Sequence, residues 1–250
     1  MQARGWVPFA SSFAAFFTRA YDFIRMGAIS RANIRLSGSH AGVSIGEDGP
    51  SQMALEDIAS LRAVTGSTVL HPSDANQTAR LVAAMANREG IVYLRTLRPA
   101  TPVLYGSDEE FEIGGSRVIR SSDDDDVTLV GCGVTVHEAI GAADTLAHEG
   151  ISARVIDCYS IKPIDAETVG AAAEQTGRIV TVEDHWPEGG LGDAVLEALA
   201  ATDMEARVVK LAVGGMPGSG KPAELLAEAG IDAEAIAEAA RQLVASAVRA

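Results

Sequence analysis

Cysteine is scarce in this sequence, with only Cys132 and Cys158 among 250 positions. Both lie in apolar segments that are typical of strands or of the turns beside them. Two isolated thiols cannot form a disulfide framework and lack the spacing of a zinc site. We therefore expect a protein of a reducing compartment, the cytoplasm.

Basic residues are also few. Lys and Arg number 20 against 34 Asp and Glu, which gives a formal net charge of -14. Binding to nucleic acid of any sequence needs basic side chains that displace counterions from phosphates, so nucleic acid is excluded as an expected partner. A local group of Arg and His could still bind a phosphorylated small molecule.

Long hydrophobic runs are missing as well. Because no stretch of about twenty apolar residues is present, we expect no membrane-spanning helix. The apolar segment FASSFAAFF near the start is followed by Arg19, Asp22 and Arg25 at helical spacing. This pattern is typical of a surface-facing helix stripe and not of a secretory signal.

The sequence is rich in Ala, Val, Gly and Leu, whereas aromatic residues make up only 5%. This composition suits buried parallel strands covered by Ala-rich helices. Apolar periodicity predicts a first α/β unit that opens on a long helix with no strand before it. The predicted helices of this unit are 12–30, 53–63 and 75–88, and its predicted strands are 33–37, 67–70 and 91–94.

The periodicity is lost between Arg98 and Asp126, where Pro, Gly and acidic residues gather. We expect residues 99–126 to link a domain of residues 1–98 to one of residues 127–250. The run SSDDDD (121–126) is interpreted as a solvated turn, because a calcium loop needs an alternation of ligands that it lacks. No metal-ligating residue is predicted in the chain.

A second unit alternates strands and helices from Val127 onward and closes with predicted helices at 223–229 and 232–248. The predicted fold class is therefore α/β, with two open, mainly parallel sheets. The turn GCGVTVHEA (131–139) is only loosely similar to a dinucleotide-binding fingerprint, since its third glycine is missing. Nucleotide binding is not expected there.

The segment Gly38–Met53 is unusual for a loop between a strand and a helix, with four glycines, a histidine and an adjacent Glu-Asp pair. In an open parallel sheet, ligands bind at the loops that leave the carboxyl ends of strands. His40 could exchange a hydrogen bond with a hydroxyl or a phosphate, and Asp48 could accept from sugar hydroxyls. The alternative is that Asp48 only caps the next helix and His40 only closes a turn.

Several long motifs resemble the transketolase family, and together they cover nearly the whole chain. They are SFAAFFTRA (12–20), HAGVSIGEDGPSQM (40–53), TVLHPSD (68–74), RTLRP (95–99), VEDHWPEGGLG (182–192) and SGKPAELL (219–226). The resemblance implies an N-terminally truncated pyrimidine-binding domain in residues 1–98, which is an incomplete thiamine-diphosphate-binding fold. It implies that residues 127–250 form the transketolase C-terminal domain. Gln52, in place of a second histidine, looks like the animal-type and split-subunit branch.

The resemblance also implies a function: transfer of a two-carbon ketol unit between sugar phosphates on thiamine diphosphate, as in the pentose phosphate pathway. In this family an N-terminal domain binds the diphosphate and Mg²⁺, and the middle domain of the partner chain binds the pyrimidine. The implied partners are sugar phosphates and a second copy of the chain, an N-terminal transketolase subunit, or both.

Four residues are implied to bind the cofactor. Phe16 should stack on the aminopyrimidine ring with Phe13 beside it, because a flat aromatic surface suits a flat heterocycle. Gln52 should lie near the amino group of the cofactor or the substrate, and Arg19 matches a position close to the cofactor. Core packing remains an alternative for Phe13 and Phe17.

Three residues are implied to bind the substrate. His40 and Asp48 match positions that hold sugar hydroxyls and phosphate, and Arg98 matches a phosphate-binding arginine. From the residues alone, Arg98 would be only a polar side chain that ends a strand.

No catalytic residue is predicted in this chain. The family's activating glutamate lies in an AEQN-like segment upstream of the Phe13 region, and Glu47, Glu56 and Glu183 do not match it. The first strand of the sheet is expected to be missing too, which would expose a sheet edge. His71, Cys132 and Lys221 have no matching role, and Asp184 and His185 are expected to be structural or to contact a dimer partner.

Three interpretations follow. The chain is a C-terminal section of a transketolase, as a split subunit or a fragment, and is inactive alone. Alternatively, it is a non-catalytic dimerisation module derived from that family. A third possibility is another thiamine-dependent subunit, such as a deoxyxylulose phosphate synthase or a 2-oxoacid dehydrogenase β chain, although GSH…GEDGPSQ and SGKPAELL resemble transketolase more closely.

Overall fold

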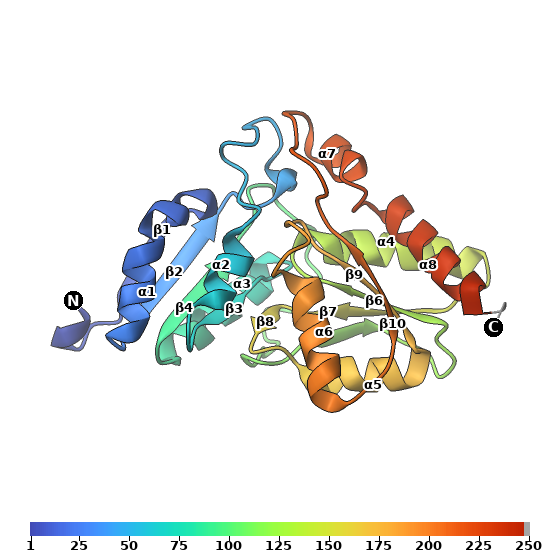
Figure 1. Ribbon diagram of the computed structural model, residues 1–250, viewed down its shortest axis with the longest axis horizontal. Helices are drawn as coiled ribbons and strands as arrows, with labels where there is room; N and C mark the ends of the chain where they lie inside the picture. The colour runs from blue at the N-terminus through green and yellow to red at the C-terminus, as the bar shows by residue number, and fades with distance from the viewer. Residues whose placement is uncertain (248–250) are drawn as a thin grey trace.

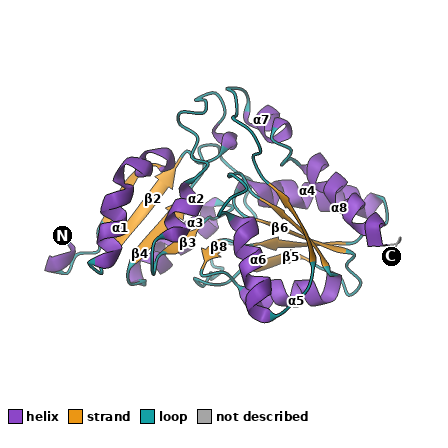
Figure 2. Cartoon of the chain, in the orientation of Figure 1, coloured by secondary structure: helices purple, strands orange, loops and turns teal. Residues whose placement is uncertain are grey.

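The computed structural model describes residues 1–247, which form two five-stranded sheets with helices on their faces (Figures 1 and 2). The first sheet is parallel except for its last strand, which runs antiparallel to β3. Its strands, in spatial order, are β1 (Phe9–Phe13), β2 (Ile34–Ser39), β4 (Ile91–Arg95), β3 (Thr68–Leu70) and β8 (Ser160–Lys162).

The start of the chain differs from the predicted continuous helix over 12–30. Strand β1 comes first, at the edge of the sheet, and is followed by a 3-10 helix, η2 (Ala14–Ala20), and by α1 (Tyr21–Ile29). The expectation that no strand precedes the helix is therefore wrong. The sequence FASSF hides the strand because its first four residues are exposed, so no buried stripe marks it.

The helices α2 (Asp57–Ala63) and α3 (Ala75–Asn87) pack on the sheet, whereas η3 (Val43–Ile45) lies in the loop after β2, against α7. A short 3-10 turn, η1 (Gln2–Arg4), precedes β1. Asp74 caps α3 by accepting a hydrogen bond from the Gln77 amide at 2.7 Å. At the other end of α3, the buried guanidinium of Arg35 donates to the carbonyls of Met85 (2.6 Å) and Ala86 (2.9 Å).

The second sheet is built in the same way, with one antiparallel edge strand, β5. In spatial order its strands are β10 (Arg207–Leu211), β9 (Arg178–Val182), β6 (Val127–Gly131), β7 (Ala153–Asp157) and β5 (Arg117–Arg120). Its helices are α4 (Val134–His148), α5 (Ala166–Thr176), α6 (Leu191–Thr202), α7 (Pro222–Glu228) and α8 (Ala233–Ala247). Position 248, the last of the predicted final helix, lies outside the described residues.

The segment 99–126, expected to link two domains, packs against both halves: its strand β5 pairs with β7, and Tyr105 and Phe111 join an apolar cluster with Leu70 and Leu81. The buried ring of Phe111 lies edge-on to Tyr105 (4.9 Å between centroids) and to Tyr159 (5.4 Å). Within the acidic run, Asp125 is buried and pairs with Arg154 at 3.2 Å. The interpretation of that run as a solvated turn is therefore wrong for Asp125, although Asp123 and Asp124 are exposed.

The two halves share structure beyond this segment. Strand β8, which follows the second half's β7 in sequence, completes the first sheet beside β3. The amino end of α4 packs on the loop after β3, where His137 Nε2 lies 2.8 Å from the Ser73 carbonyl oxygen. The carboxyl ends of strands from both sheets therefore meet at the junction between the halves.

Candidate functional site

The segment Gly38–Met53 begins within the last residues of β2 and continues into the loop that rises above the sheet toward α7 (Figure 1). His40 has a left-handed backbone conformation, with φ 59°, which turns the chain away from the strand direction. The segment thus lies at the carboxyl edge of a parallel sheet, where such folds bind ligands.

Three of the predicted site residues stack on one another there. The rings of Phe13 and His40 are 3.8 Å apart between centroids and inclined by 11°, and Phe13 and Phe16 are 5.5 Å apart and inclined by 7°. Phe16 remains 42% exposed, so part of the stack faces solvent. Of the two residues for which core packing was an alternative, Phe17 is buried against Tyr93, whereas Phe13 is only half-buried within the stack.

A second group lies at the tip of the same segment. Arg98 Nη1 donates to the Ile45 carbonyl oxygen at 3.0 Å and lies 3.5 Å from Asp48 Oδ1 and 3.6 Å from Glu47 Oε2. The Arg98 side chain is 43% exposed. A partly exposed guanidinium with long, weak ion pairs can exchange them for a phosphate.

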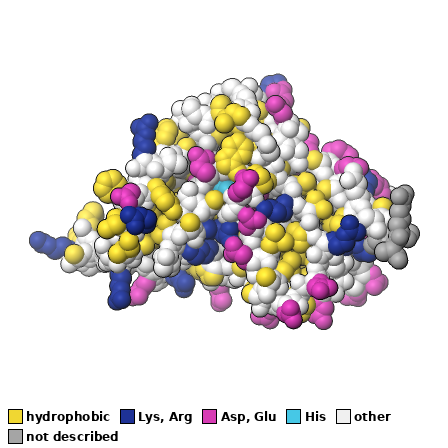
Figure 3. All heavy atoms as spheres, in the orientation of Figure 1, with side chains coloured by type: hydrophobic (Ala, Val, Ile, Leu, Met, Phe, Trp, Pro, Cys, Tyr) yellow, Lys and Arg dark blue, Asp and Glu magenta, His cyan; other side chains and the backbone are white. Residues whose placement is uncertain are grey.

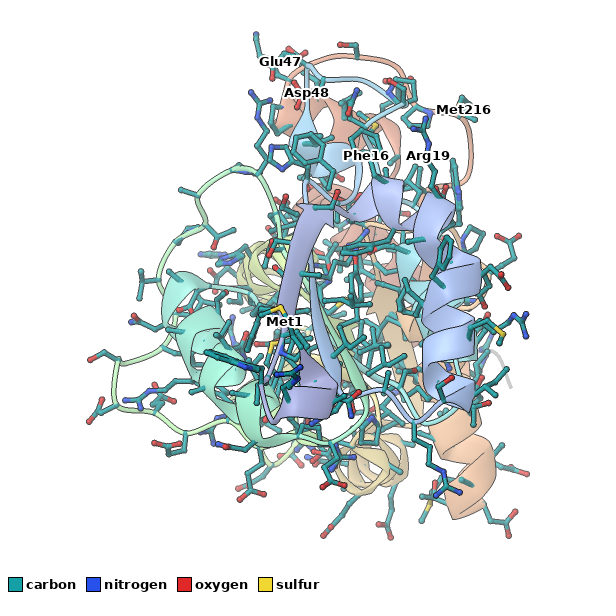
Figure 4. The ribbon with its side chains drawn as sticks, turned by 90° about the vertical axis from the view of Figure 1, so that its left-hand side faces the viewer. Met1, Phe16, Arg19, Glu47, Asp48 and Met216 are labelled. Carbon is teal, nitrogen blue, oxygen red and sulfur yellow. The ribbon has the colours of Figure 1, made fainter. Side chains whose placement is uncertain are left out.

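The other two predicted residues, Gln52 and Arg19, lie near the end of the same segment and in η2. Gln52 is half-buried, and its backbone amide donates to the Gly49 carbonyl. Arg19 is exposed and makes no ion pair within the part of the chain that the structure describes. Figure 4 shows Phe16 and Arg19 at the same end of the molecule as Glu47 and Asp48, and far from Met1.

The sequence did not reveal a buried ionic group beneath this surface. Arg95 Nε donates to Asp57 Oδ2 at 2.9 Å, and the Tyr93 hydroxyl donates to the same oxygen at 2.6 Å. Both charged side chains are at most 1% exposed. Burial by itself would lower the pKa of Arg95, but Asp57 and Asp184 outweigh it and raise that pKa. The one signal was an arginine at the end of the otherwise apolar strand IVYLR.

Asp184 and His185 extend this group from the second half. Arg95 Nη2 donates to the Asp184 carbonyl oxygen at 2.8 Å, and His185 Nδ1 lies 2.7 Å from the Trp186 carbonyl oxygen. Burial lowers the pKa of His185 to about 4, which keeps its ring neutral near pH 7. Both residues thus lie at the junction of the two halves of one chain.

Of the residues without a predicted role, His71 and both cysteines are buried, and Lys221 is exposed. His71 is fully buried, with neither ring nitrogen hydrogen-bonded to a described residue, and burial holds its pKa well below the usual range. Cys132 and Cys158 are free thiols whose pKa values are raised by burial. Lys221 is exposed at the start of α7 and pairs with Glu224.

Two kinds of feature are absent from residues 1–247. Within this range, no group of three or more His, Cys, Asp or Glu side chains is arranged to hold a metal ion. No described helix is both long and apolar enough to cross a membrane. Acidic and basic side chains are interspersed on the face shown in Figure 3, and apolar side chains gather over its α1 side.

Comparison with known protein families assigns both halves. Residues 1–103 match the pyrimidine-binding domain of transketolase, and residues 116–236 match the transketolase C-terminal domain. These matches confirm the resemblance read from the motifs.

Individual relatives agree with this assignment. The chain is 53% identical to human transketolase over 242 residues, which is 96% of this chain and 39% of the relative. It is 54% identical to bovine transketolase-like protein 1 over 241 residues, or 95% and 40% of the two chains. The chain thus spans about two fifths of the length of the curated relatives it matches.

Solved structures confirm the predicted fold class. A structure described as a split gene transketolase, inactive beta4 tetramer, superposes with a TM-score of 0.87 at 36% identity, covering 97% of this chain and 77% of that one. A transketolase from Pichia stipitis shares the fold, with a TM-score of 0.78 at 23% identity over 95% and 34% of the two chains. On the evidence of its two domains and its close relatives, the chain belongs to the transketolase family.

Proposed function

We propose that this chain forms part of a transketolase active site that transfers a two-carbon ketol unit between sugar phosphates on thiamine diphosphate. The observation that carries the proposal is that the Phe13–Phe16–His40 stack and the Arg98–Asp48 pair both form on the Gly38–Met53 segment, through His40 and Asp48, at one sheet edge. The first group suits a flat heterocycle, and the second suits a phosphorylated sugar.

The aromatic stack fits the pyrimidine of the cofactor. Phe13 and Phe16 have nearly parallel rings, and Phe16 is partly exposed, so a third flat ring can pack on the stack. Arg19 follows Phe16 by three residues in η2, and Gln52 is the last residue but one of the Gly38–Met53 segment. We assign these four residues to cofactor binding, with the two polar side chains at the edge of the ring.

His40, Asp48 and Arg98 would bind the sugar phosphate. His40 Nδ1 is 2.9 Å from the Ser39 hydroxyl, so its Nε2 is the nitrogen free to meet a sugar hydroxyl. The Asp48 carboxylate accepts from hydroxyl groups, and Arg98 can bind phosphate oxygens with two parallel N–H donors. These residues bind and orient the sugar.

Thiamine diphosphate, when bound, supplies the carbon centre that carries the two-carbon unit. A polypeptide segment outside these 250 residues would bind the diphosphate and its Mg²⁺ and would supply the activating glutamate. That segment would belong to an N-terminal transketolase subunit or a second chain. We assign none of those roles to a side chain of this sequence, and we expect the assembled enzyme to act in the cytoplasm.

Apolar side chains support a partner surface on the first half. More than half of the exposed large apolar side chains among the described residues lie within residues 1–29. Strand β1 is also an unpaired sheet edge on its outer side. The members of this surface on β1, η2 and α1 are Phe9, Phe16, Phe23, Met26 and Ile29. Such a patch is typical of an interface with another chain.

One observation favours the alternative function, in which the chain is a dimerisation module without catalytic activity. The neighbour with the TM-score of 0.87 is described as an inactive tetramer of a split gene transketolase. We propose that this chain, too, is inactive on its own and gains activity only with a partner. Another thiamine-dependent activity is not favoured by any feature of the site.

Complementation tests the proposal. The purified chain is assayed with xylulose 5-phosphate, ribose 5-phosphate, thiamine diphosphate and Mg²⁺, first alone and then with a polypeptide that carries the N-terminal part of a transketolase including its glutamate segment. We expect ketol transfer only from the mixture. Turnover by the chain alone would overturn partner dependence, and no turnover from a complex that demonstrably forms would favour the non-catalytic module.

A further inference from the structure

We propose that Asp184 and Ser219, two residues of the C-terminal half, are positioning residues for the sugar-binding segment. They hold its backbone from Gly42 to Glu47, between His40 and Asp48, without contacting substrate themselves. The proposal rests on the proposed function for the role of that segment, whereas the contacts themselves belong to the fold.

Asp184 anchors the start of the segment. Its carboxylate accepts hydrogen bonds from two consecutive backbone amides, Val43 N at 2.6 Å (Oδ1) and Ser44 N at 3.1 Å (Oδ2). The side chain is completely buried, so water cannot replace either bond. A Cβ atom at Gly42, which has φ 78°, would lie 2.0 Å from Asp184 Oδ2. The carboxylate thus fits a space that only a glycine in the segment leaves open.

Arg95 fixes Asp184 in turn. Arg95 donates to the carbonyl oxygens of Asp184 (2.8 Å) and Ala54 (2.9 Å). Because Ala54 directly follows the Gly38–Met53 segment, Arg95 connects Asp184 to the end of that segment. Burial raises the pKa of Asp184, opposed by Arg95 and by the two amides. These donors favour the charged carboxylate, which is the form that can accept both amides.

Ser219 anchors the tip. Its hydroxyl donates to the Glu47 carbonyl oxygen at 2.6 Å. Next to this bond, a Cβ at Gly46 would lie 3.0 Å from Pro222 Cδ and 3.3 Å from the Gly220 carbonyl oxygen. The SGKP turn therefore packs directly against the backbone beside Asp48. Figure 1 shows this turn, just before α7, next to the loop that follows β2.

The two anchors explain how the second half can serve the site from outside it. Between them, Ile45 offers its carbonyl oxygen to Arg98, so the backbone held by Asp184 and Ser219 also orients the phosphate-binding guanidinium. A segment with four glycines loses much conformational entropy when it is ordered. The anchors supply that order before the sugar binds, which favours binding of the substrate.

Amide hydrogen exchange on the whole chain tests the contacts directly. The variants are Asp184→Asn, which replaces one acceptor oxygen with an amide donor facing an N–H, and Ser219→Ala, which removes one hydroxyl. Asp193→Asn is the control, because Asp193 accepts from the Gly189 amide and pairs with Lys210 within the same half. We expect exchange at Val43 and Ser44 to accelerate about tenfold or more in the first variant, and exchange near Glu47 to accelerate severalfold in the second. Unchanged protection of the segment in both variants overturns the proposal.

The complemented enzyme then tests the positioning role. We expect Ser219→Ala to raise KM for the sugar phosphate about threefold to tenfold with kcat less affected, and Asp193→Asn to leave both unchanged. Faster exchange with unchanged KM would overturn positioning while leaving the proposed function intact. If the complemented parent chain has no activity, the proposed function fails, and the exchange result still reports whether the anchors hold the segment. If Asp184→Asn does not fold, Ser219→Ala alone decides the outcome.

Discussion

The imidazole of His40 lies flat against the ring of Phe13, with 3.8 Å between the centroids. The register of the first sheet brings them together, because Phe13 at the end of β1 is paired with Ser39 at the end of β2, and His40 follows. Phe13, which we assign to cofactor binding, thus packs against His40, which we assign to sugar binding. The two binding roles are therefore expected to change together when either ring is altered.

Replacing Phe13 with Leu tests this coupling. Leu keeps an apolar side chain but removes the flat surface, which is worth about 0.5–1.5 kcal/mol beyond the buried area. In the complemented enzyme we expect both KM for the sugar phosphate and the thiamine diphosphate concentration at half-maximal rate to rise, each by up to about tenfold. A change in only one of the two would contradict coupling through the stack.

Arg98→Lys tests phosphate recognition. Lys keeps the charge but loses the paired N–H donors, and it cannot bond both the Ile45 carbonyl and a phosphate in the same geometry. We expect KM to rise about tenfold for phosphorylated sugars and little for unphosphorylated ones. Arg80→Lys is the matched control, since Arg80 pairs with Glu110 on another surface. Equal effects on both substrate classes would remove Arg98 from phosphate binding.

The fold was predictable where burial leaves a pattern in the sequence. Strands β4 and β6 are buried at every position and read as short apolar runs, and α3 has its cap in the sequence HPSD. Strand β1 was missed because it lies at a sheet edge and buries almost nothing. Strand β5 was missed because its residues alternate between half-buried and exposed.

The candidate site was predictable only in part. The motifs indicated its residues, but composition and spacing could not predict that Phe13 meets His40, since the contact depends on the register between β1 and β2. Nor could they predict the Arg95–Asp57 pair, because its members are 38 residues apart and each alone is typical of a surface. Such contacts arise from tertiary packing.

The buried pair predicts a large stability effect. Replacing Arg95 with Met leaves the Asp57 carboxylate buried with only the Tyr93 hydroxyl as a side-chain donor. We expect the free energy of unfolding to fall by about 3–5 kcal/mol. Arg241→Met is the control: Arg241 pairs with Glu149 and Glu238 at the surface, so we expect a much smaller loss. Urea unfolding of both variants measures the difference, and similar losses would contradict the prediction.

Replacing Gly133 with Ala tests how tightly His71 packs at the junction between the two halves. Gly133 has φ 59°, and a Cβ there would lie 2.1 Å from His71 Nε2, so Gly133→Ala combines backbone strain with a steric clash. We expect a loss of more than about 3 kcal/mol in unfolding free energy. Gly150→Ala has similar backbone strain, at φ 80°, but no atom within 4 Å, so we expect a loss of only about 1–2 kcal/mol.

A double variant separates the clash from the strain. With His71→Ala in the background, Gly133→Ala should cost at least about 1 kcal/mol less than it does alone, because the clashing ring is gone. Additive losses in urea unfolding would show that His71 does not oppose the new methyl group.

Glu183 makes the free energy of unfolding depend on pH, and the sign of this dependence follows from its pKa shift. Its buried carboxylate accepts from the Leu191 (2.6 Å) and Gly192 (2.9 Å) amides at the start of α6, and burial raises its pKa to about 7 in spite of these bonds. Lys210 and Arg95 favour the charged form, and the neutral ring of His185 lies 3.8 Å away. The folded chain therefore binds a proton near pH 7 that the unfolded chain binds only near 4.5.

The contribution of this group to stability is fully present below pH 4.5 and is lost as the pH rises through 7. Glu183→Gln cannot titrate, so the unfolding free energy of the variant relative to the parent should rise by about 2–3 kcal/mol between pH 5 and pH 8. Urea unfolding of the parent and Glu183→Gln across this range measures the effect. A constant difference between parent and Glu183→Gln would mean that Glu183 keeps its charge in the folded chain throughout, held by the two amides and Lys210.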